Sequence, residues 1–274
     1  MESAQGKNRQ HFDKSYGGNP AENYQKYFVP VIGKPIAADL ISVANIKPGE
    51  KIIDIACGTG VAAFLAKEKT GKDGMVAGVD VNPGMLGVAR SITPENISID
   101  WYESPADNIP LDDNTFDVAL SSLSLQFFPD KPAALKEIYR VLKPGGRLAF
   151  IVPGPTPIFV ETDETFSKHL GKEAAGFIRA VFSLNDHSEI NDMIKDTGFK
   201  DVSVRSEKKD LHLPPPQDFL WQYMTSTPLS SFIEKMDKET YATMESEVVE
   251  KWQPFVQNNS LVLKHDTIIA IANK

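Results

Sequence analysis

The stretch KIIDIACGTGVAAFLAKEK, residues 51–69, decides the fold that we expect for this chain. Its first part, 51–56, is a β-branched apolar run typical of a buried strand, and 61–69 has the pattern of a helix. The turn between them, 57–60, contains two glycines, which allow the backbone to bend sharply and a ligand to approach it. Because open α/β sheets bind ligands at the carboxyl ends of their strands, the stretch predicts a parallel sheet with a ligand site at this turn.

The same alternation of apolar runs and helical patterns continues as far as residue 152. It predicts repeated βα units on a parallel sheet. The helices are expected at 61–69, 82–91 and 131–142, and the strands at 51–56, 75–80, 97–101, 116–122 and 148–152. Five strands separated by helices predict a doubly wound arrangement.

The second half of the chain is less regular. A helix that opens at Ser188 and closes at Gly198 precedes an alternating run, 201–206, and a last strand is expected at 266–272. Much of the rest has helical patterns that would project from the sheet. The expected fold is therefore in the α/β class: a Rossmann-like, doubly wound, mostly parallel seven-stranded sheet with a helical cap.

Composition excludes several classes of protein. The 274 residues are 41% hydrophobic and 24% charged, close to a typical globular chain, which argues against disordered and fibrous proteins. The net charge of -8, with no basic patch beyond Lys208 and Lys209, argues against a nucleic-acid partner. The lone cysteine, Cys57, cannot form an internal disulfide. Nowhere do 18 apolar residues follow one another, so no membrane span is expected. The expected location is cytoplasmic.

Two carboxylates at the ends of neighbouring strands indicate the ligand. Asp80 ends the second strand twenty residues after Gly60, where an acidic residue can bind both hydroxyls of a ribose. The run Gly58-x-Gly60-x-x-Ala63 also fits the dinucleotide fingerprint, so the glycines alone leave a nicotinamide cofactor open. Asp54 beside the turn would repel a pyrophosphate and suits an ammonium group. S-adenosylmethionine, which has an ammonium group and no phosphate, is therefore the expected cofactor.

Four motifs carry a resemblance to class I S-adenosylmethionine-dependent methyltransferases. They are IIDIACGTG (52–60), GVDVNPGML (78–86), SPADNIPLDDNTFDVALSS (104–122) and LKEIYRVLKPGGRLAF (135–150). Their order and spacing resemble most the small-molecule group that includes the ubiquinone and menaquinone C-methyltransferases. The resemblance covers residues 20–155 and continues more loosely beyond them.

The resemblance implies roles for individual residues. It assigns the methionyl ammonium and carboxylate to Asp54 and to the main chain of Ala56, Gly58 and Gly60, and the ribose hydroxyls to Asp80. The further residues that it implies, around the adenine and the methyl group and on the lid, are Val81, Met85, Ala106, Asp107, Ser121, Ser122 and Tyr27.

The resemblance has one departure and one alternative. Pro105 stands where the family often has an acidic residue, so the acceptor for the adenine amino group stays open between Ser104 and Asp107. Tyr27 is expected to place its hydroxyl near the cofactor carboxylate, but together with Tyr24 it could instead only pack the lid.

The resemblance also divides the chain. Residues 1–46 are expected to form N-terminal lid helices. Residues 47–213 and 261–274 would form the S-adenosylmethionine-binding core, with a helical insertion near 157–182. Residues 214–260 would form a helical substrate cap.

The methyl acceptor is expected to be a small, largely apolar molecule in a capped pocket. The fourth strand ends in SSLSLQFF and lacks the Asn/Asp-Pro-Pro-aromatic motif of enzymes that methylate amino nitrogens of bases or glutamine. Gln126 and Phe127 are expected to line the way to the acceptor, and Phe219, Trp221 and Tyr223 are candidates for the pocket wall. Which acceptor atom is methylated stays open.

No catalytic residue can be named, and no metal is expected. The five histidines lack metal-ligand spacing, and three of them are candidates for a general base: His11, His169 and His187. His212 and His265 are expected on the surface. Carbon acceptors activated by a phenolate, or sulfur and arsenic nucleophiles, need no base. Three alternatives to the proposed enzyme remain: a non-catalytic S-adenosylmethionine-binding protein, a nicotinamide-dependent oxidoreductase and a macromolecular methyltransferase.

Overall fold

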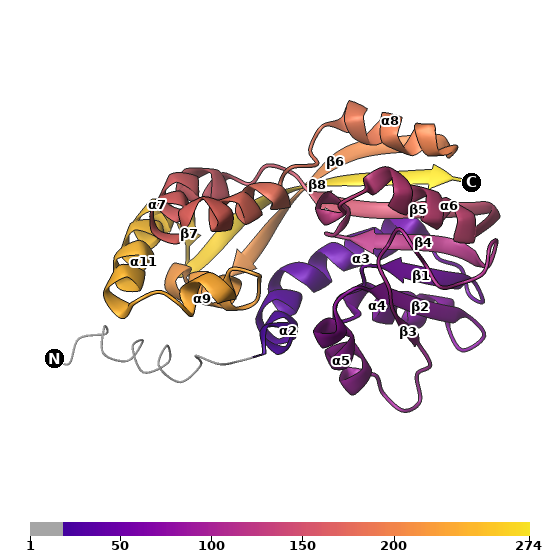
Figure 1. The fold of residues 1–274 in the computed structure, drawn as a ribbon, viewed down its shortest axis with the longest axis horizontal. Coiled ribbons are helices and arrows are strands. Elements are labelled where there is room, and N and C mark those ends of the chain that lie inside the picture. The colour runs from indigo at the N-terminus through magenta and orange to yellow at the C-terminus, as the bar shows by residue number, and fades with distance from the viewer. Residues whose placement is uncertain (1–18) are drawn as a thin grey trace.

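A computed structural model describes residues 19–274 and builds them around one mixed sheet (Figure 1). The strand order is β3-β2-β1-β4-β5-β8-β6, with the short β7 paired to β8. The strands are β1 Lys51–Ile55, β2 Met75–Asp80, β3 Asp100–Glu103, β4 Phe116–Ser122, β5 Leu142–Pro153, β6 Lys200–Leu213, β7 Val256–Gln257 and β8 Ser260–Asn273. The pairs among β1 to β5 are parallel, whereas β8 runs antiparallel to its neighbours. The α/β class and the mostly parallel sheet are confirmed.

Helices cover both faces of the parallel part of the sheet. They are α3 Lys34–Ala44, α4 Val61–Thr70, α5 Pro83–Ile92, α6 Lys131–Val141 and α8 His187–Thr197. Alternate residues of β1 enter opposite cores, since Ile52 packs with α3 and α4 while Ile53 and Ile55 pack with α6 and α8. Both faces of the strand are therefore buried, as its unbroken apolar run requires. By the same alternation, Asp54 lies on the face of α3 and α4.

One long helix precedes the first strand. It consists of α2 Pro20–Asn23, the π-helical η1 Tyr24–Gly33 and α3, and Asn19 caps its start. By length and composition it is the one helix within residues 19–274 that could cross a membrane. Ile36 and Leu40 have no exposed surface and belong to the core of the sheet domain. This part of the helix is therefore a core element.

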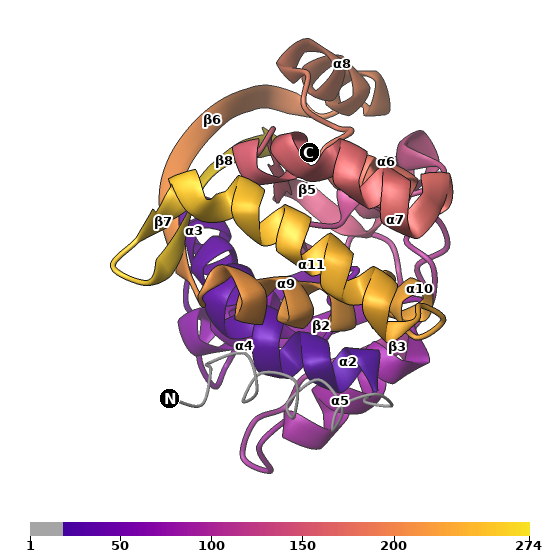
Figure 2. The same cartoon turned by 90° about the vertical axis from the view of Figure 1, so that its left-hand side faces the viewer.

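Two strands of the sheet extend beyond its parallel part, and a second group of helices surrounds them. Beyond the last β5 pair, Pro153 with Thr267, β6 and β8 continue as a two-stranded ribbon (Figures 1 and 2). The helices around this ribbon are α7 Pro157–Val181, α9 Pro216–Thr225, α10 Ser230–Ile233, α11 Lys238–Trp252 and the 3-10 turn η3 Gln253–Phe255. Four aromatic side chains pack together at their centre: Phe159, Phe219, Tyr223 and Trp252. That residues 214–260 act as a substrate cap stays a prediction.

Several element boundaries differ from those expected. The third strand starts at Asp100 instead of 97, because Ile97 closes a turn onto Pro94. Asp186 and not Ser188 caps α8, accepting hydrogen bonds from the main-chain N–H groups of Ser188 and Glu189. Both antiparallel strands are about twice the expected length, because their outer halves pair with each other away from the parallel strands.

Candidate functional site

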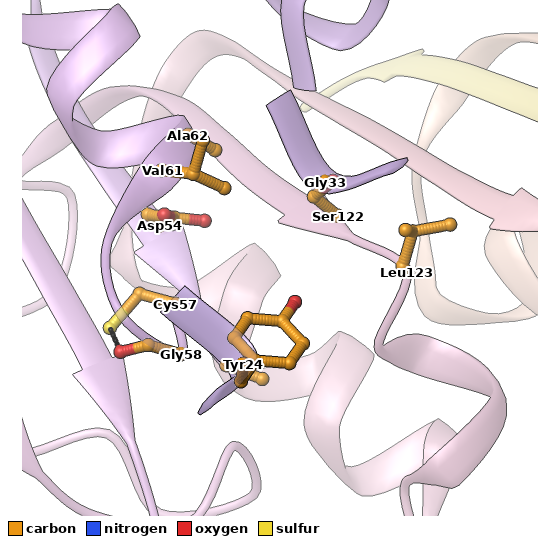
Figure 3. Close-up of a pocket in the computed structure, with 10 residues that line it drawn as sticks. Tyr24, Gly33, Asp54, Cys57, Gly58, Val61, Ala62, Ser122 and Leu123 are labelled. Carbon is orange, nitrogen blue, oxygen red and sulfur yellow. Dashed lines mark hydrogen bonds between the residues drawn. The ribbon is translucent and has the colours of Figure 1, made fainter. Parts of the chain in front are cut away.

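A pocket lies where β1 and β4 end at the carboxyl edge of the sheet (Figure 3). The space within it, together with the open solvent at its mouth, is about 330 Å³. The first turn of α4 completes its wall together with the long helix of α2, η1 and α3, which we call the lid. The lining residues are Tyr24, Gly33, Asp54, Ala56, Cys57, Gly58, Val61, Ala62, Ser122 and Leu123. The site expected from the strand–glycine–helix stretch is therefore hollowed and partly enclosed.

The glycine turn between β1 and α4 has three residues in the left-handed region. Ala56 has φ 54°, Gly58 φ 56° and Gly60 φ 90°. A Cβ on Gly60 would collide with the ring of Trp101, whereas one on Gly58 would meet only the Tyr24 ring, at 3.9 Å. Gly58 thus keeps the pocket side open, while Gly60 allows Trp101 to pack beneath the turn. Ala56 and Gly58 line the pocket as expected, and Gly60 does not.

Asp54 presents a buried carboxylate to the pocket. Its side chain is 1% exposed, and neither oxygen has a hydrogen-bond partner among the described residues. The nearby Thr59 hydroxyl lacks a partner in the same way. Burial raises the pKa of Asp54 to about 8, opposed by the nearby main-chain N–H of Ala63 and reinforced slightly by the charge of Asp80. A buried carboxylate without a partner is costly, so this position fits a ligand that brings a positive charge.

Asp80 holds the turn in place from the neighbouring strand. Its Oδ2 accepts a hydrogen bond from the Gly58 N–H at 2.7 Å, and its Oδ1 accepts one from the Asn82 N–H at 2.8 Å. Burial nevertheless raises its pKa. A carboxylate has about four lone-pair positions, so those that the main-chain N–H groups leave free can still accept a ribose hydroxyl. Asp80 does not line the pocket itself but joins it through Gly58.

The residues expected around the adenine lie beyond Asp80. Val81 is 65% exposed, and Met85 is half-buried in the first turn of α5. Ala106 and Asp107 occupy a turn after β3, which the Ser104 N–H ties to the Asp80 carbonyl at 3.0 Å. The structure thus brings these four side chains to the end of β2, outside the lining of the pocket, and their contacts to adenine stay predictions.

That turn is held from the other side by a pair of side chains on α6. Glu137 accepts a hydrogen bond from the Ile109 N–H at 2.9 Å. The Arg140 guanidinium donates to the carbonyls of Ile109 and Leu111, at 2.8 and 2.9 Å, and forms ion pairs with Glu137 and Asp113. The LKEIYRVL motif therefore contributes the support of this loop.

At the end of β4, one of two neighbouring serines lines the pocket and the other does not. Ser122 and Leu123 line the pocket, whereas Ser121 is buried and shares a 2.6 Å hydrogen bond with the Ser124 hydroxyl. Successive side chains of a strand point to opposite faces, so only one of the two serines can face the pocket. Of the two serines expected at the methyl group, Ser122 lies beside the pocket and Ser121 does not.

On the lid, one of two tyrosines lines the pocket and the other packs elsewhere. Tyr24 lines the pocket, and burial together with the nearby Asp80 and Asp54 raises its pKa. Tyr27 instead packs edge-on against Trp221 of α9, with ring centroids 5.4 Å apart. The lid tyrosine at the pocket is therefore Tyr24, whereas the sequence favoured Tyr27 of the two.

The candidate acceptor residues separate into two groups. Phe219 and Tyr223 are buried in the aromatic centre around α7, α9 and α11, and Trp221 contacts the lid. Gln126 is buried in the short 3-10 turn η2 Leu125–Phe127, and Phe127 is partly exposed and stacks on Phe177 of α7. None of the five lines the pocket, so their contacts to an acceptor stay predictions.

No histidine within residues 19–274 lines the pocket. His11 falls outside the described residues. His169 pairs with Glu247 at 3.0 Å and His187 contacts Ser206, while His265, expected on the surface, is buried beside Thr156. Within residues 19–274 no cluster of His, Cys, Asp or Glu could hold a metal ion.

Sequence reasoning missed part of the pocket wall. Gly33 and Leu123 line it, and Leu123 adopts a left-handed φ of 55° that no glycine or asparagine signals. Gly33 follows Tyr24 by nine residues on the lid, and the helical pattern alone does not show that both reach the same pocket.

Comparison with known proteins identifies the family. The model of the ubiE/COQ5 methyltransferase family matches residues 38–209. A demethylmenaquinone methyltransferase of Staphylococcus epidermidis is 31% identical over 180 residues, which cover 61% of this chain and 75% of that protein.

Solved structures share the fold. A methyltransferase structure from Bacillus halodurans aligns with a TM-score of 0.57 at 20% identity, covering 87% of this chain and 98% of that one. The phosphoethanolamine N-methyltransferase 2 of Haemonchus contortus, bound to S-adenosylmethionine, aligns with a TM-score of 0.60 at 20% identity, covering 97% and 59%. The chain belongs to the ubiE/COQ5 methyltransferase family and is an S-adenosylmethionine-dependent methyltransferase.

Proposed function

We propose that this enzyme binds S-adenosylmethionine in the pocket beside Asp54 and methylates a ring carbon of a small, largely apolar hydroquinone. The observation that carries the cofactor assignment is the buried Asp54 carboxylate, which has no partner among the described residues. The similarity to a demethylmenaquinone methyltransferase supports the acceptor class.

The residues present fit the cofactor. Asp54 would bind the methionyl ammonium, the main chain at Gly58 would lie along the methionyl group, and Asp80 would accept the ribose hydroxyls. The bound cofactor supplies a methyl group activated by its attachment to a sulfonium. Tyr24 lies over the glycine turn from the lid, where it would help to exclude water.

The titratable groups of the site favour an acceptor that needs no protein base. Asp54 and Asp80 would be occupied by the ammonium and the ribose, burial raises the pKa values of Tyr24 and Cys57 and keeps them protonated, and no described histidine lines the pocket. A hydroquinone provides its own nucleophile, because a phenolate oxygen increases the electron density of the neighbouring ring carbons. That carbon gains the methyl group and loses its proton to solvent.

The surroundings of the pocket favour an apolar acceptor. Leu123 forms the wall at the end of β4, and the stacked Phe127 and Phe177 lie on the adjoining turn and on α7. Tyr27 and Trp221 close the contact between the lid and α9. An aromatic ring system can bury its faces against such side chains.

Calorimetry and a transfer assay together test this proposal. The wild type should bind S-adenosylmethionine, and Asp54→Asn should bind it at least about a hundredfold more weakly, because the ion pair with the ammonium is lost. Label from methyl-tritiated S-adenosylmethionine should enter 1,4-naphthalenediol kept reduced with dithionite.

The control is Asp163→Asn, which removes a carboxylate that pairs with Arg179 away from the pocket and should bind as the wild type does. Label that enters only RNA or protein would contradict the acceptor class. Equal binding by the wild type and Asp54→Asn would contradict the cofactor assignment.

A further inference from the structure

A buried amide oxygen behind the pocket wall has no partner within the described residues. Gln126 is 5% exposed, and its Nε2 donates a hydrogen bond to the Leu123 carbonyl at 2.9 Å. Its Oε1 is buried and accepts no hydrogen bond from any of residues 19–274. The Leu123 contact fixes the orientation of the amide, because a flipped amide would place two acceptors face to face. The free group is therefore a hydrogen-bond acceptor.

The position of this oxygen relates it to the acceptor end of the site. Leu123, whose carbonyl Gln126 holds, lines the pocket next to Ser122. Ser122 is the last residue of β4, and β4 lies beside β1 in the sheet, with Leu120 opposite Asp54. Two buried hydroxyls near this turn, those of Ser121 and Ser124, form a hydrogen bond with each other at 2.6 Å. Gln126 does not itself line the pocket, and its unmet acceptor lies behind the wall, one hydrogen bond from Leu123, which does line it.

We propose that Gln126 is a specificity-determining residue whose Oε1 accepts a hydrogen bond from a hydroxyl group of the methyl acceptor. This inference rests on the proposed function. An amide oxygen cannot pair with a carbonyl or an ether oxygen, so the residue selects an acceptor that carries a hydroxyl at this point. Gln126 thereby distinguishes a hydroquinone from the corresponding quinone, which has nearly the same shape and no donor.

The magnitude follows from the cost of an unpaired polar group. A site built to hydrogen-bond a hydroxyl rejects an analogue that lacks it, because its own buried group then stays unpaired. For one neutral hydrogen bond we expect a preference of about tenfold to hundredfold for the hydroquinone.

Binding of dead-end analogues to the protein saturated with S-adenosylhomocysteine tests the inference. The probes are 2,3-dimethyl-1,4-naphthoquinone and its hydroquinone, in which both reactive ring positions are blocked against methylation and against addition of Cys57. The wild type should bind the hydroquinone about tenfold to hundredfold more tightly than the quinone. Gln126→Leu should bind the two forms within about twofold of each other.

The ratio separates recognition from a structural role. If Gln126 only held the Leu123 turn, Gln126→Leu would weaken both probes equally and keep the ratio, and that result would overturn the inference. The melting temperature and the S-adenosylhomocysteine affinity of the variant show whether it is folded, and Gln126→Met replaces it if it is not.

Failure of the proposed function gives a different result. A wild type that binds S-adenosylhomocysteine but neither probe would overturn the acceptor class and this inference together. A wild type that methylates 1,4-naphthalenediol while Gln126→Leu keeps the preference would overturn this inference alone.

Discussion

At the scale of the residue, Asp54 is a buried carboxylate that destabilises the ligand-free protein and that a bound cation would stabilise. Its carboxylate is buried, has no hydrogen-bond partner among the described residues, and has a pKa raised to about 8. Such a group destabilises the ligand-free protein in its charged form and is stabilised by a cation. Two consequences for pH dependence follow, one for binding and one for stability.

Cofactor affinity should rise with pH below the pKa of Asp54. Between pH 6 and 7.5 most Asp54 carboxyls are protonated in the free protein, whereas the bound ammonium favours the carboxylate, so binding releases a proton. We expect the association constant to increase by up to about tenfold per pH unit in this range. Calorimetry in two buffers of different ionisation enthalpy measures the released proton directly. A flat affinity profile would show that Asp54 is already ionised.

Asp54→Asn should stabilise the cofactor-free protein at alkaline pH. Because the folded pKa of about 8 exceeds the unfolded value, the stability that Asp54 contributes is present at low pH and is lost as the pH rises through 8. The variant should therefore melt about 2 °C or more above the wild type at pH 8.5, and the difference should shrink towards pH 4. Melting curves without cofactor measure this, and a difference independent of pH would argue against the assignment.

At the scale of the element, the turn between β1 and α4 uses its two glycines differently. Both have positive φ, but only Gly60 lies against a side chain, the ring of Trp101, that leaves no space for a Cβ. Gly58 faces the lid and the pocket and donates its N–H to the Asp80 carboxylate. One turn therefore supports both the packing of the sheet and the ligand site.

Alanine at the two glycines should separate stability from binding. Gly60→Ala should lower the free energy of unfolding by about 2–4 kcal/mol, since it adds a collision with Trp101 to the cost of a left-handed backbone. Gly58→Ala should cost about 1–2 kcal/mol and should weaken S-adenosylmethionine binding more than its stability loss explains. Urea unfolding and calorimetry on both variants make the comparison. Equal losses of stability would contradict the packing role of Gly60.

At the scale of the whole molecule, the lid joins the sheet domain to the helices around the ribbon. Tyr24 lies over the pocket, while three residues later Tyr27 packs on Trp221 of α9. The Asn23 side chain also donates a hydrogen bond to the Thr225 carbonyl at 3.4 Å. The helix that covers the pocket is thus held by the helices around the ribbon.

Tyr27→Ala should therefore loosen the lid without touching the pocket. An aromatic pair contributes about 0.5–1.5 kcal/mol, so we expect S-adenosylhomocysteine to dissociate about twofold to tenfold faster. Stopped-flow tryptophan fluorescence measures the rate. Val160→Ala, which shortens an exposed side chain on α7, is the control and should leave it unchanged. An unchanged rate in Tyr27→Ala would show that the lid is held by its own helix alone.

The parallel half of the fold could be predicted because its signals are local. The apolar run, the glycine turn and the helix of residues 51–69 follow one another, and each depends on neighbouring residues. The lengths of β6 and β8 could not be predicted in this way. Their outer halves pair across about 50 residues of intervening chain, and the charged side chains of Lys208, Lys209 and Asp210 conceal a strand whose partner is remote.

By itself, the sequence determined the class of fold and the dependence on S-adenosylmethionine, and it located Asp54 and Asp80 at the ends of neighbouring strands, because these depend on residue type and short spacing. Only the tertiary structure decided which side chains face the pocket. Strand alternation placed Ser122 there and turned Ser121 away. In the wider turn of the π-helical lid, Tyr24 and Tyr27 point in different directions, towards the pocket and towards Trp221. Such facing depends on backbone geometry and on partners distant in the chain, which no local pattern encodes.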